Sequence, residues 1–177
     1  MQRAIKLSVK PTWNEIEKAR IESLQFLQSH GFSGDSIHSL TMVITELIEN
    51  SIKYGYFDLR KDRVKVNISL DETNVTIEVS NPVTETTTDH LRRLDKTIQW
   101  IRGYQDPFEA YIERLKEVAK KPLKDEESGL GLVRIAYEGN GILDFFVSDD
   151  DLLNVSTVSN IRELRGEHHA QKGITYQ

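Results

Sequence analysis

Five short segments of the chain alternate hydrophobic and polar residues, which is the pattern of strands that bury one face. In the first segment, Ile5, Leu7 and Val9 alternate with polar neighbours. Pro82 is expected to halt the third strand, because proline cannot donate a hydrogen bond to a β-ladder. The predicted strands cover residues 2–9, 63–70, 74–80, 141–148 and 152–158. Short polar turns separate the second from the third and the fourth from the fifth, so each of these pairs is predicted to form a hairpin.

Three other segments carry apolar residues every three or four positions, which is the period of an amphipathic helix. These predicted helices cover residues 13–30, 35–54 and 130–138. Thr12 and Glu15 have the spacing of a capping box at the start of the first helix, and Gly31 and Gly55 are expected to end the first two. The second helix has one continuous apolar face, made by Ile37, Leu40, Val43, Ile44, Leu47 and Ile48.

Residues 83–127 contain two more amphipathic stripes and are predicted to form an inserted, mostly helical region rather than a linker. The first stripe consists of Leu91, Leu94, Ile98 and Ile101. The second consists of Phe108, Tyr111, Ile112 and Leu115. The segment after Asn160 is polar and is expected to fray.

The order of these elements predicts an α+β two-layer sandwich. Runs of strands are interrupted by paired helices, which favours helices on one face of a mixed, mainly antiparallel sheet. Residues 1–160 are predicted to form a single domain with a helical insert at about 83–127, and residues 161–177 a polar C-terminal tail. A chain of 177 residues suits one domain with one core.

Composition excludes several classes of function. The formal net charge is −5, which argues against a nucleic-acid partner because phosphate contacts need a basic surface. The chain has no cysteine, which excludes disulfides, thiolate metal sites and cysteine nucleophiles. No apolar run approaches the roughly 18 residues that span a bilayer, and the start MQRAIKLSVKP lacks the apolar run of a signal peptide. We therefore expect a cytoplasmic protein with no membrane partner.

The second helix carries three polar residues that suit magnesium and phosphate. At about 100° per residue, Glu46, Asn50 and Lys53 fall in one narrow sector beside the apolar face. An asparagine oxygen with phosphate oxygens is a normal magnesium environment, the lysine can neutralise phosphate, and the glutamate can act as a general base. The alternative for these residues taken alone is a solvated polar face of a helix.

Two glycines precede the third predicted helix. Gly129 and Gly131 lie in the segment ESGLGLVRI, just before the apolar run. Glycine lets a backbone approach phosphate closely, and the start of a helix offers unpaired N–H groups to an anion. Taken alone, the alternative is an ordinary loop that enters a helix.

Together and in this order, the two elements resemble the histidine-kinase-type (GHKL) ATPase superfamily. ELIENSIKYG (46–55) resembles its N box, and SGLGL (128–132) resembles its second glycine box. The likeness spans about residues 5–158 and implies a Bergerat-type ATP-binding fold that uses ATP and Mg²⁺. It implies that Glu46 is the general base, Asn50 the magnesium ligand and Lys53 a phosphate contact. The residues that it implies around the phosphates are Ser128, Gly129, Leu130, Gly131 and Leu132.

The segment after the third predicted strand departs from this family. The first glycine box of the family is Asp-x-Gly-x-Gly, whereas this chain has EVSNPVTETT (78–87), without aspartate or glycine. Ser80 or Asn81 occupies the position that reads adenine, and we assign Asn81, whose amide oxygen is an uncharged acceptor. The altered box and the long insert resemble the SiaB-like kinases more than a sensor kinase.

Three functions follow from the resemblance. The first is an ATP-dependent serine/threonine protein kinase of a bacterial partner-switching system, which binds and phosphorylates a small antagonist protein. The second is a non-catalytic module that sequesters a partner such as a sigma factor, because the first glycine box is degenerate. An ATP hydrolase or conformational switch is ranked last, since such enzymes usually carry further domains. A homodimer is possible by analogy with anti-sigma kinases.

Overall fold

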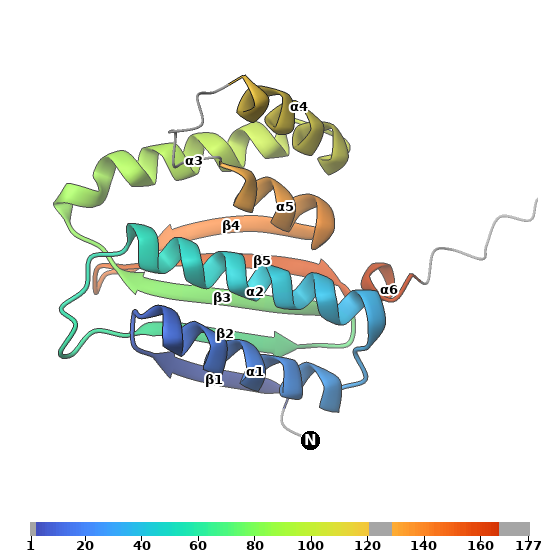
Figure 1. The fold of residues 1–177 in the computed structure, drawn as a ribbon, viewed down its shortest axis with the longest axis horizontal. Coiled ribbons are helices and arrows are strands. Elements are labelled where there is room, and N and C mark those ends of the chain that lie inside the picture. The colour runs from blue at the N-terminus through green and yellow to red at the C-terminus, as the bar shows by residue number, and fades with distance from the viewer. Residues whose placement is uncertain (1–2, 121–128, 167–177) are drawn as a thin grey trace, which may run out of the picture.

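A single antiparallel sheet forms one layer of the protein. The computed structural model describes residues 3–120 and 129–166 (Figure 1). The strands are β1 (Ala4–Val9), β2 (Val64–Leu70), β3 (Asn74–Pro82), β4 (Gly141–Val147) and β5 (Leu152–Asn160). Their order in the sheet is β1-β2-β3-β5-β4, and each neighbouring pair is antiparallel. In the described part of the chain the sheet is therefore antiparallel rather than mixed.

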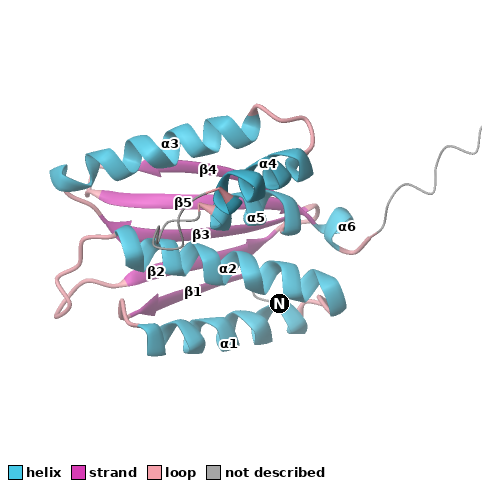
Figure 2. Ribbon diagram, turned by 45° about the horizontal axis from the view of Figure 1, so that its top comes forward, coloured by secondary structure: helices cyan, strands magenta, loops and turns pink. Residues whose placement is uncertain are grey.

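Helices cover one face of this sheet and form the second layer (Figures 1 and 2). They are α1 (Trp13–Ser29), α2 (Gly34–Tyr54), α3 (Thr88–Arg102), α4 (Pro107–Ala119), α5 (Leu130–Glu138) and α6 (Ile161–Leu164), with a short 3₁₀ turn η1 (Glu85–Thr87) before α3. The predicted α+β two-layer sandwich is confirmed. No helix among the described residues is long and apolar enough to cross a membrane.

Helix α2 lies over the middle of the sheet and supplies much of the core. All six residues of its predicted apolar face are buried, and Leu40, Val43, Ile44 and Ile48 are fully enclosed. They pack against the inward side chains of the central strands, such as Val66, Ile68 and Ile77. The burial of this face fixes the orientation of α2 about its own axis. That orientation determines where the polar residues beside the face, Glu46, Asn50 and Lys53, lie.

The insert forms helices α3 and α4, as predicted, beside β4 at one edge of the sheet (Figure 1). Arg102 of α3 donates a hydrogen bond to the carbonyl oxygen of Leu143 in β4 at 2.6 Å. The first apolar stripe is inward, with Leu94, Ile98 and Ile101 buried. On α4 the buried residue is instead Ala110, because this helix contacts the rest of the fold mainly through α5.

Two local expectations are corrected by the structure. Thr12 precedes α1 but its side chain makes no capping hydrogen bond, and Glu15 accepts a hydrogen bond from Lys18 at 2.6 Å instead of completing a capping box. The residues directly after Asn160 do not fray. They form α6, whose first N–H groups bond to the Asn160 side chain and whose Leu164 is buried.

We predict that Ile44→Ala lowers the free energy of unfolding by about 2–5 kcal/mol, because it leaves a cavity in a closely packed core. Ile44 is fully buried, whereas Ile21 on α1 is 41% exposed. The matched change Ile21→Ala should cost less than about 1 kcal/mol. Urea denaturation of both variants is the measurement. Equal losses would contradict the placement of α2 at the centre of the core.

Candidate nucleotide site

A cavity of about 480 Å³ lies where α2, the ends of β3 and β5, the insert and the start of α5 meet. Seven of the residues that the sequence predicts for the site line it: Glu46, Asn50, Lys53, Asn81, Gly129, Gly131 and Leu132. Leu130 does not line it and packs at the margin of the core. Ser128 lies outside the described residues. The structure thus brings together segments that are far apart in the sequence.

The polar sector of α2 forms one wall of this cavity. Glu46 and Asn50 are one turn apart on the helix and both are partly buried, whereas Lys53 is exposed. Leu47 and Ser51 on the same helix line the cavity beside them. The burial of the apolar face therefore directs a carboxylate, an amide and an ammonium group toward the same space, as the helical spacing predicts.

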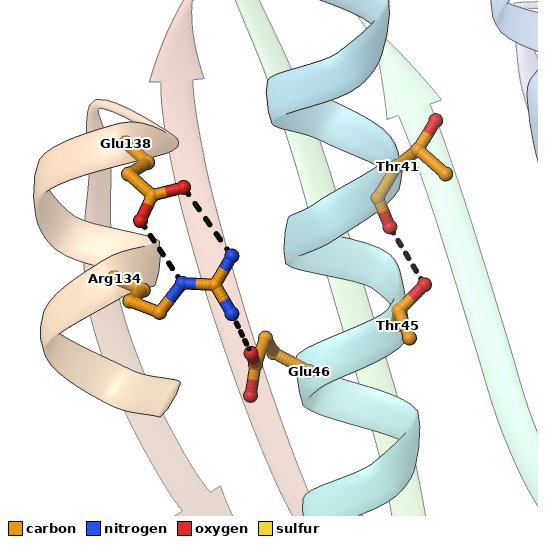
Figure 3. Close-up of polar contacts among 5 residues, drawn as sticks. All are labelled: Thr41, Thr45, Glu46, Arg134 and Glu138. Carbon is orange, nitrogen blue, oxygen red and sulfur yellow. Dashed lines mark hydrogen bonds and ion pairs between the residues drawn. The ribbon is translucent and has the colours of Figure 1, made fainter. Parts of the chain in front are cut away.

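Glu46 is held by an arginine that sequence analysis did not single out (Figure 3). Arg134 of α5 donates from Nη1 to Glu46 Oε1 at 2.7 Å. The same guanidinium donates from Nε to Glu138 Oε1 at 2.9 Å and from Nη2 to Glu138 Oε2 at 3.4 Å. Glu138 therefore orients Arg134, and Arg134 orients Glu46. Among the described residues, Glu46 Oε2 has no hydrogen-bond partner.

The pKa of Glu46 reflects two opposing influences. Burial raises it above the usual value, because a carboxylate loses hydration there, and the neighbouring Glu49 and Glu138 add to this increase. The positive charge of Arg134 acts in the opposite direction. A carboxylate with a raised pKa is a stronger base than an ordinary glutamate, which suits proton abstraction.

Gly131 allows the start of α5 to approach α2 closely. A Cβ atom at this position would lie 2.5 Å from Glu46 Oε2 and 3.6 Å from Asn50 Nδ2. A distance of 2.5 Å is a collision, so any side chain would displace the carboxylate or the helix. Gly131 therefore brings the first turn of α5 against both polar groups, and it leaves Oε2 facing that turn.

Gly129 begins α5 in a left-handed backbone conformation, with φ of 64°. Glycine adopts this conformation without the strain that a Cβ would add. As the N-cap residue it offers no side chain for a capping hydrogen bond. Gly129 and Gly131 line the cavity, so the positive end of the helix dipole lies beside it, which is a suitable environment for an anion.

The floor of the cavity is formed by alternate residues of β3 and β5. Val79, Asn81, Leu153 and Val155 line it, because side chains two residues apart on a strand point to the same face. Ser80 points to the other face of the sheet, where its hydroxyl donates to Asn154 Oδ1 at 2.6 Å. Of the two residues considered for adenine recognition, Asn81 is therefore the one that lines the cavity.

The insert adds basic residues that sequence analysis did not assign to the site. His90, Arg93 and Lys96 of α3 and Arg114 of α4 line the cavity. The His90 ring stacks on Tyr54 at the end of α2, with ring centroids 4.0 Å apart. A helical-wheel analysis could have found the α3 residues, since they border the apolar stripe of that helix. The fold was needed to show that both insert helices face α2 and α5.

This set of groups fits a magnesium–nucleotide complex better than a preformed metal site. The described residues contain no cluster of three histidine or acidic side chains that could hold an ion. Magnesium would instead need Asn50 together with phosphate oxygens and water, which is a coordination that Mg²⁺ commonly accepts. The basic residues of the cavity would suit phosphates, and the apolar side chains of β3 and β5 would suit a flat base.

Comparisons with known proteins support the fold. No family model matches the chain, and no curated protein matches it. Among solved structures, it is similar to a chain in the crystal structure of the SiaB–SiaC complex from Pseudomonas aeruginosa, with a TM-score of 0.69 and 20% sequence identity. The match covers 89% of this chain and 90% of that chain. At this identity the likeness establishes a shared fold.

We predict that Arg134→Gln raises the pKa of Glu46 further, because it removes the positive charge that opposes the effect of burial. The carboxyl ¹³C resonance of Glu46, followed by NMR through a pH titration, is the measurement. Arg162→Gln, on the exposed surface of α6, is the matched control and should leave the Glu46 midpoint in place. An unchanged midpoint in Arg134→Gln would contradict the ion pair.

Proposed function

We propose that this chain is an ATP-dependent serine/threonine protein kinase that binds and phosphorylates a small partner protein in a partner-switching system. The observation that carries the proposal is the approach of α5 to α2 at Gly131. It places a helix N-terminus, Glu46 and Asn50 around one cavity. Phosphoryl transfer needs these components, because its catalysis consists mainly of positioning and of charge neutralisation.

In this proposal, the phosphates of ATP lie at the N-terminus of α5, and its adenine ring lies over the apolar floor of the cavity. Asn50 holds the magnesium ion through its amide oxygen, and Lys53 neutralises a phosphate. Bound magnesium would offset the negative charge on the phosphate oxygens. Asn81 accepts a hydrogen bond from the amino group of adenine in place of the aspartate that the resembling family uses.

The transfer step needs a base beside the acceptor hydroxyl. A serine or threonine oxygen of the partner bonds to the γ-phosphorus as the bond to the β–γ bridging oxygen breaks, and ADP leaves with that electron pair. Glu46 Oε2 receives the hydroxyl proton, while Arg134 holds Oε1. Losing such a base typically reduces the rate by a factor of about 10²–10⁴.

In this proposal, a second hollow of about 620 Å³ receives part of the partner, because it shares Glu46 with the first cavity. Arg20 of α1, Thr41 and Thr45 of α2 and Arg134 of α5 also line it. The similar solved structure is described as a complex of SiaB with SiaC, which supports a small protein as the partner.

The end of β3 favours a second candidate, a non-catalytic module that sequesters a protein such as a sigma factor. Asn81 stands there instead of an aspartate, and Val83, two residues further on, instead of a glycine. If adenine is no longer recognised, the same surfaces would serve only to bind a partner. The experiment below separates the two candidates.

Glu46→Gln should reduce the rate of phosphoryl transfer by a factor of about 10²–10⁴ while preserving nucleotide binding. Glutamine has nearly the same shape as glutamate but cannot accept the hydroxyl proton. Transfer is measured with γ-³²P-labelled ATP and an extract of the source cells, and labelled acceptors are identified by mass spectrometry. Binding is measured as the thermal shift with Mg·ATP. Ligand at 100 times its Kd adds about 2.7 kcal/mol, or roughly 5–10 °C for a domain of this size.

The same assays include Asn50→Ala and a control. Asn50→Ala should lose the magnesium-dependent part of the thermal shift, together with transfer. Glu72→Gln, in the exposed turn between β2 and β3, should behave as the wild type in both assays. A wild-type protein that shows no shift with millimolar Mg·ATP would favour the non-catalytic module. Full transfer by Glu46→Gln would overturn the role of this residue.

A further inference from the structure

Arg114 of the insert lies directly beside the start of α5. Its side chain is 20% exposed and lines the cavity. The position that a Cβ atom of Gly129 would occupy is 3.8 Å from Arg114 Nη1 and 3.9 Å from its Cζ. The guanidinium therefore lies against the left-handed N-cap of α5.

Neighbours fix the guanidinium on two sides. It lies over the ring of Trp100, with Cζ 4.6 Å from the ring centroid, and Nη1 forms an ion pair with Glu117 Oε2 at 3.0 Å. Trp100 belongs to α3 and Glu117 to α4, so both insert helices hold the group in place. Stacking on an aromatic face and a fixed ion pair pre-organise arginine for binding a further ligand.

One donor of this guanidinium is buried and unused. Arginine has five N–H donors. Arg114 Nε is buried and has no hydrogen-bond partner among the described residues. Buried donors are usually paired in folded proteins, so an unpaired one that lines a cavity indicates a missing acceptor.

The surroundings indicate which acceptor this is. Lys53, Arg93 and Lys96 also line the cavity, against the two carboxylates Glu46 and Glu49. A helix N-terminus and a cluster of cations together favour an anion with several oxygen atoms, and a guanidinium matches the oxygens of a phosphate with two parallel hydrogen bonds. The apolar side chains of Val79 and Val155 in the same cavity suit the nucleobase.

We propose that Arg114 is a phosphate-binding residue through which the helical insert selects nucleoside polyphosphates. The inference rests on the proposed function, because it assigns the phosphates to the start of α5. The insert then takes a direct part in the site, because its helix α4 supplies a cation to the phosphates. The segment between β3 and α3 contains no glycine and does not form a glycine-rich phosphate-binding loop. The competing explanation is that Arg114 only fastens α4 to α3 through Trp100.

The test compares the affinities of the full chain for ATP, ADP and AMP in the presence of Mg²⁺. Calorimetry serves for ATP and ADP, and NMR titration serves for AMP. Arg114→Met keeps a long, unbranched side chain beside Trp100 and removes the donors. It should weaken ATP binding by about 10- to 100-fold, the effect expected for a hydrogen bond between charged groups, and change AMP binding less than about twofold. Arg92→Met, at an exposed position of α3 outside the cavity, should leave all three affinities unchanged.

Arg114→Lys provides a second variant in case the first does not fold. It keeps a positive charge but loses the planar fork, and it should weaken ATP binding by roughly three- to tenfold with AMP unchanged. Unchanged ATP affinity in the folded variants would overturn the inference and leave the kinase proposal intact. An equal loss for ATP, ADP and AMP would show a structural role and would also overturn it. A wild-type chain that binds none of the three would overturn the proposed function and this inference with it.

Discussion

Gly131 lets the first turn of α5 approach α2 so closely that one added methyl group would collide with Glu46 Oε2. This contact depends on both layers of the fold. The buried face of α2 fixes how far Glu46 and Asn50 protrude, and the left-handed Gly129 fixes where α5 begins. The shape of the cavity and the position of the Glu46 carboxylate both follow from the same close approach.

The electrostatics of the site are built around that contact. Glu46 has one oxygen held by Arg134 and the other directed at the start of α5, so its carboxylate is oriented before any ligand arrives. Arg134 itself is fixed by Glu138, one turn further along α5. Charges that are held in place in advance need little reorganisation during a reaction, which is the general basis of electrostatic catalysis. The insert contributes in the same way, since Trp100 and Glu117 hold Arg114 beside the cavity.

Local patterns were sufficient to predict most of the secondary structure, and seven of the residues singled out from the sequence line the cavity. The stripe on α2 predicted both its burial and the common sector of Glu46, Asn50 and Lys53, because both depend on one helix alone. The alternating pattern predicted the strands. It did not decide whether Ser80 or Asn81 faces the cavity, because that depends on how β3 pairs with its neighbouring strands and packs under the helices.

Residues that act across elements were not predictable in this way. Arg134 reaches Glu46 over 88 positions of the chain, and no spacing rule connects two positions so far apart. Arg114 lies between the apolar positions of its helix and has the pattern of a solvated residue, until α3 and α5 are packed beside it. The capping box at Thr12 failed for a different, local reason, since Glu15 pairs with Lys18, three residues further along the same helix.

The most direct test is a crystal structure of the protein soaked with Mg²⁺ and a non-hydrolysable ATP analogue. The account predicts phosphates at the N-terminus of α5, the magnesium ion on the side-chain oxygen of Asn50, and the γ-phosphate within reach of Glu46. A nucleotide bound elsewhere on the surface, or a cavity that stays empty at saturating analogue, would contradict the claim that the approach of α5 to α2 builds a nucleotide site.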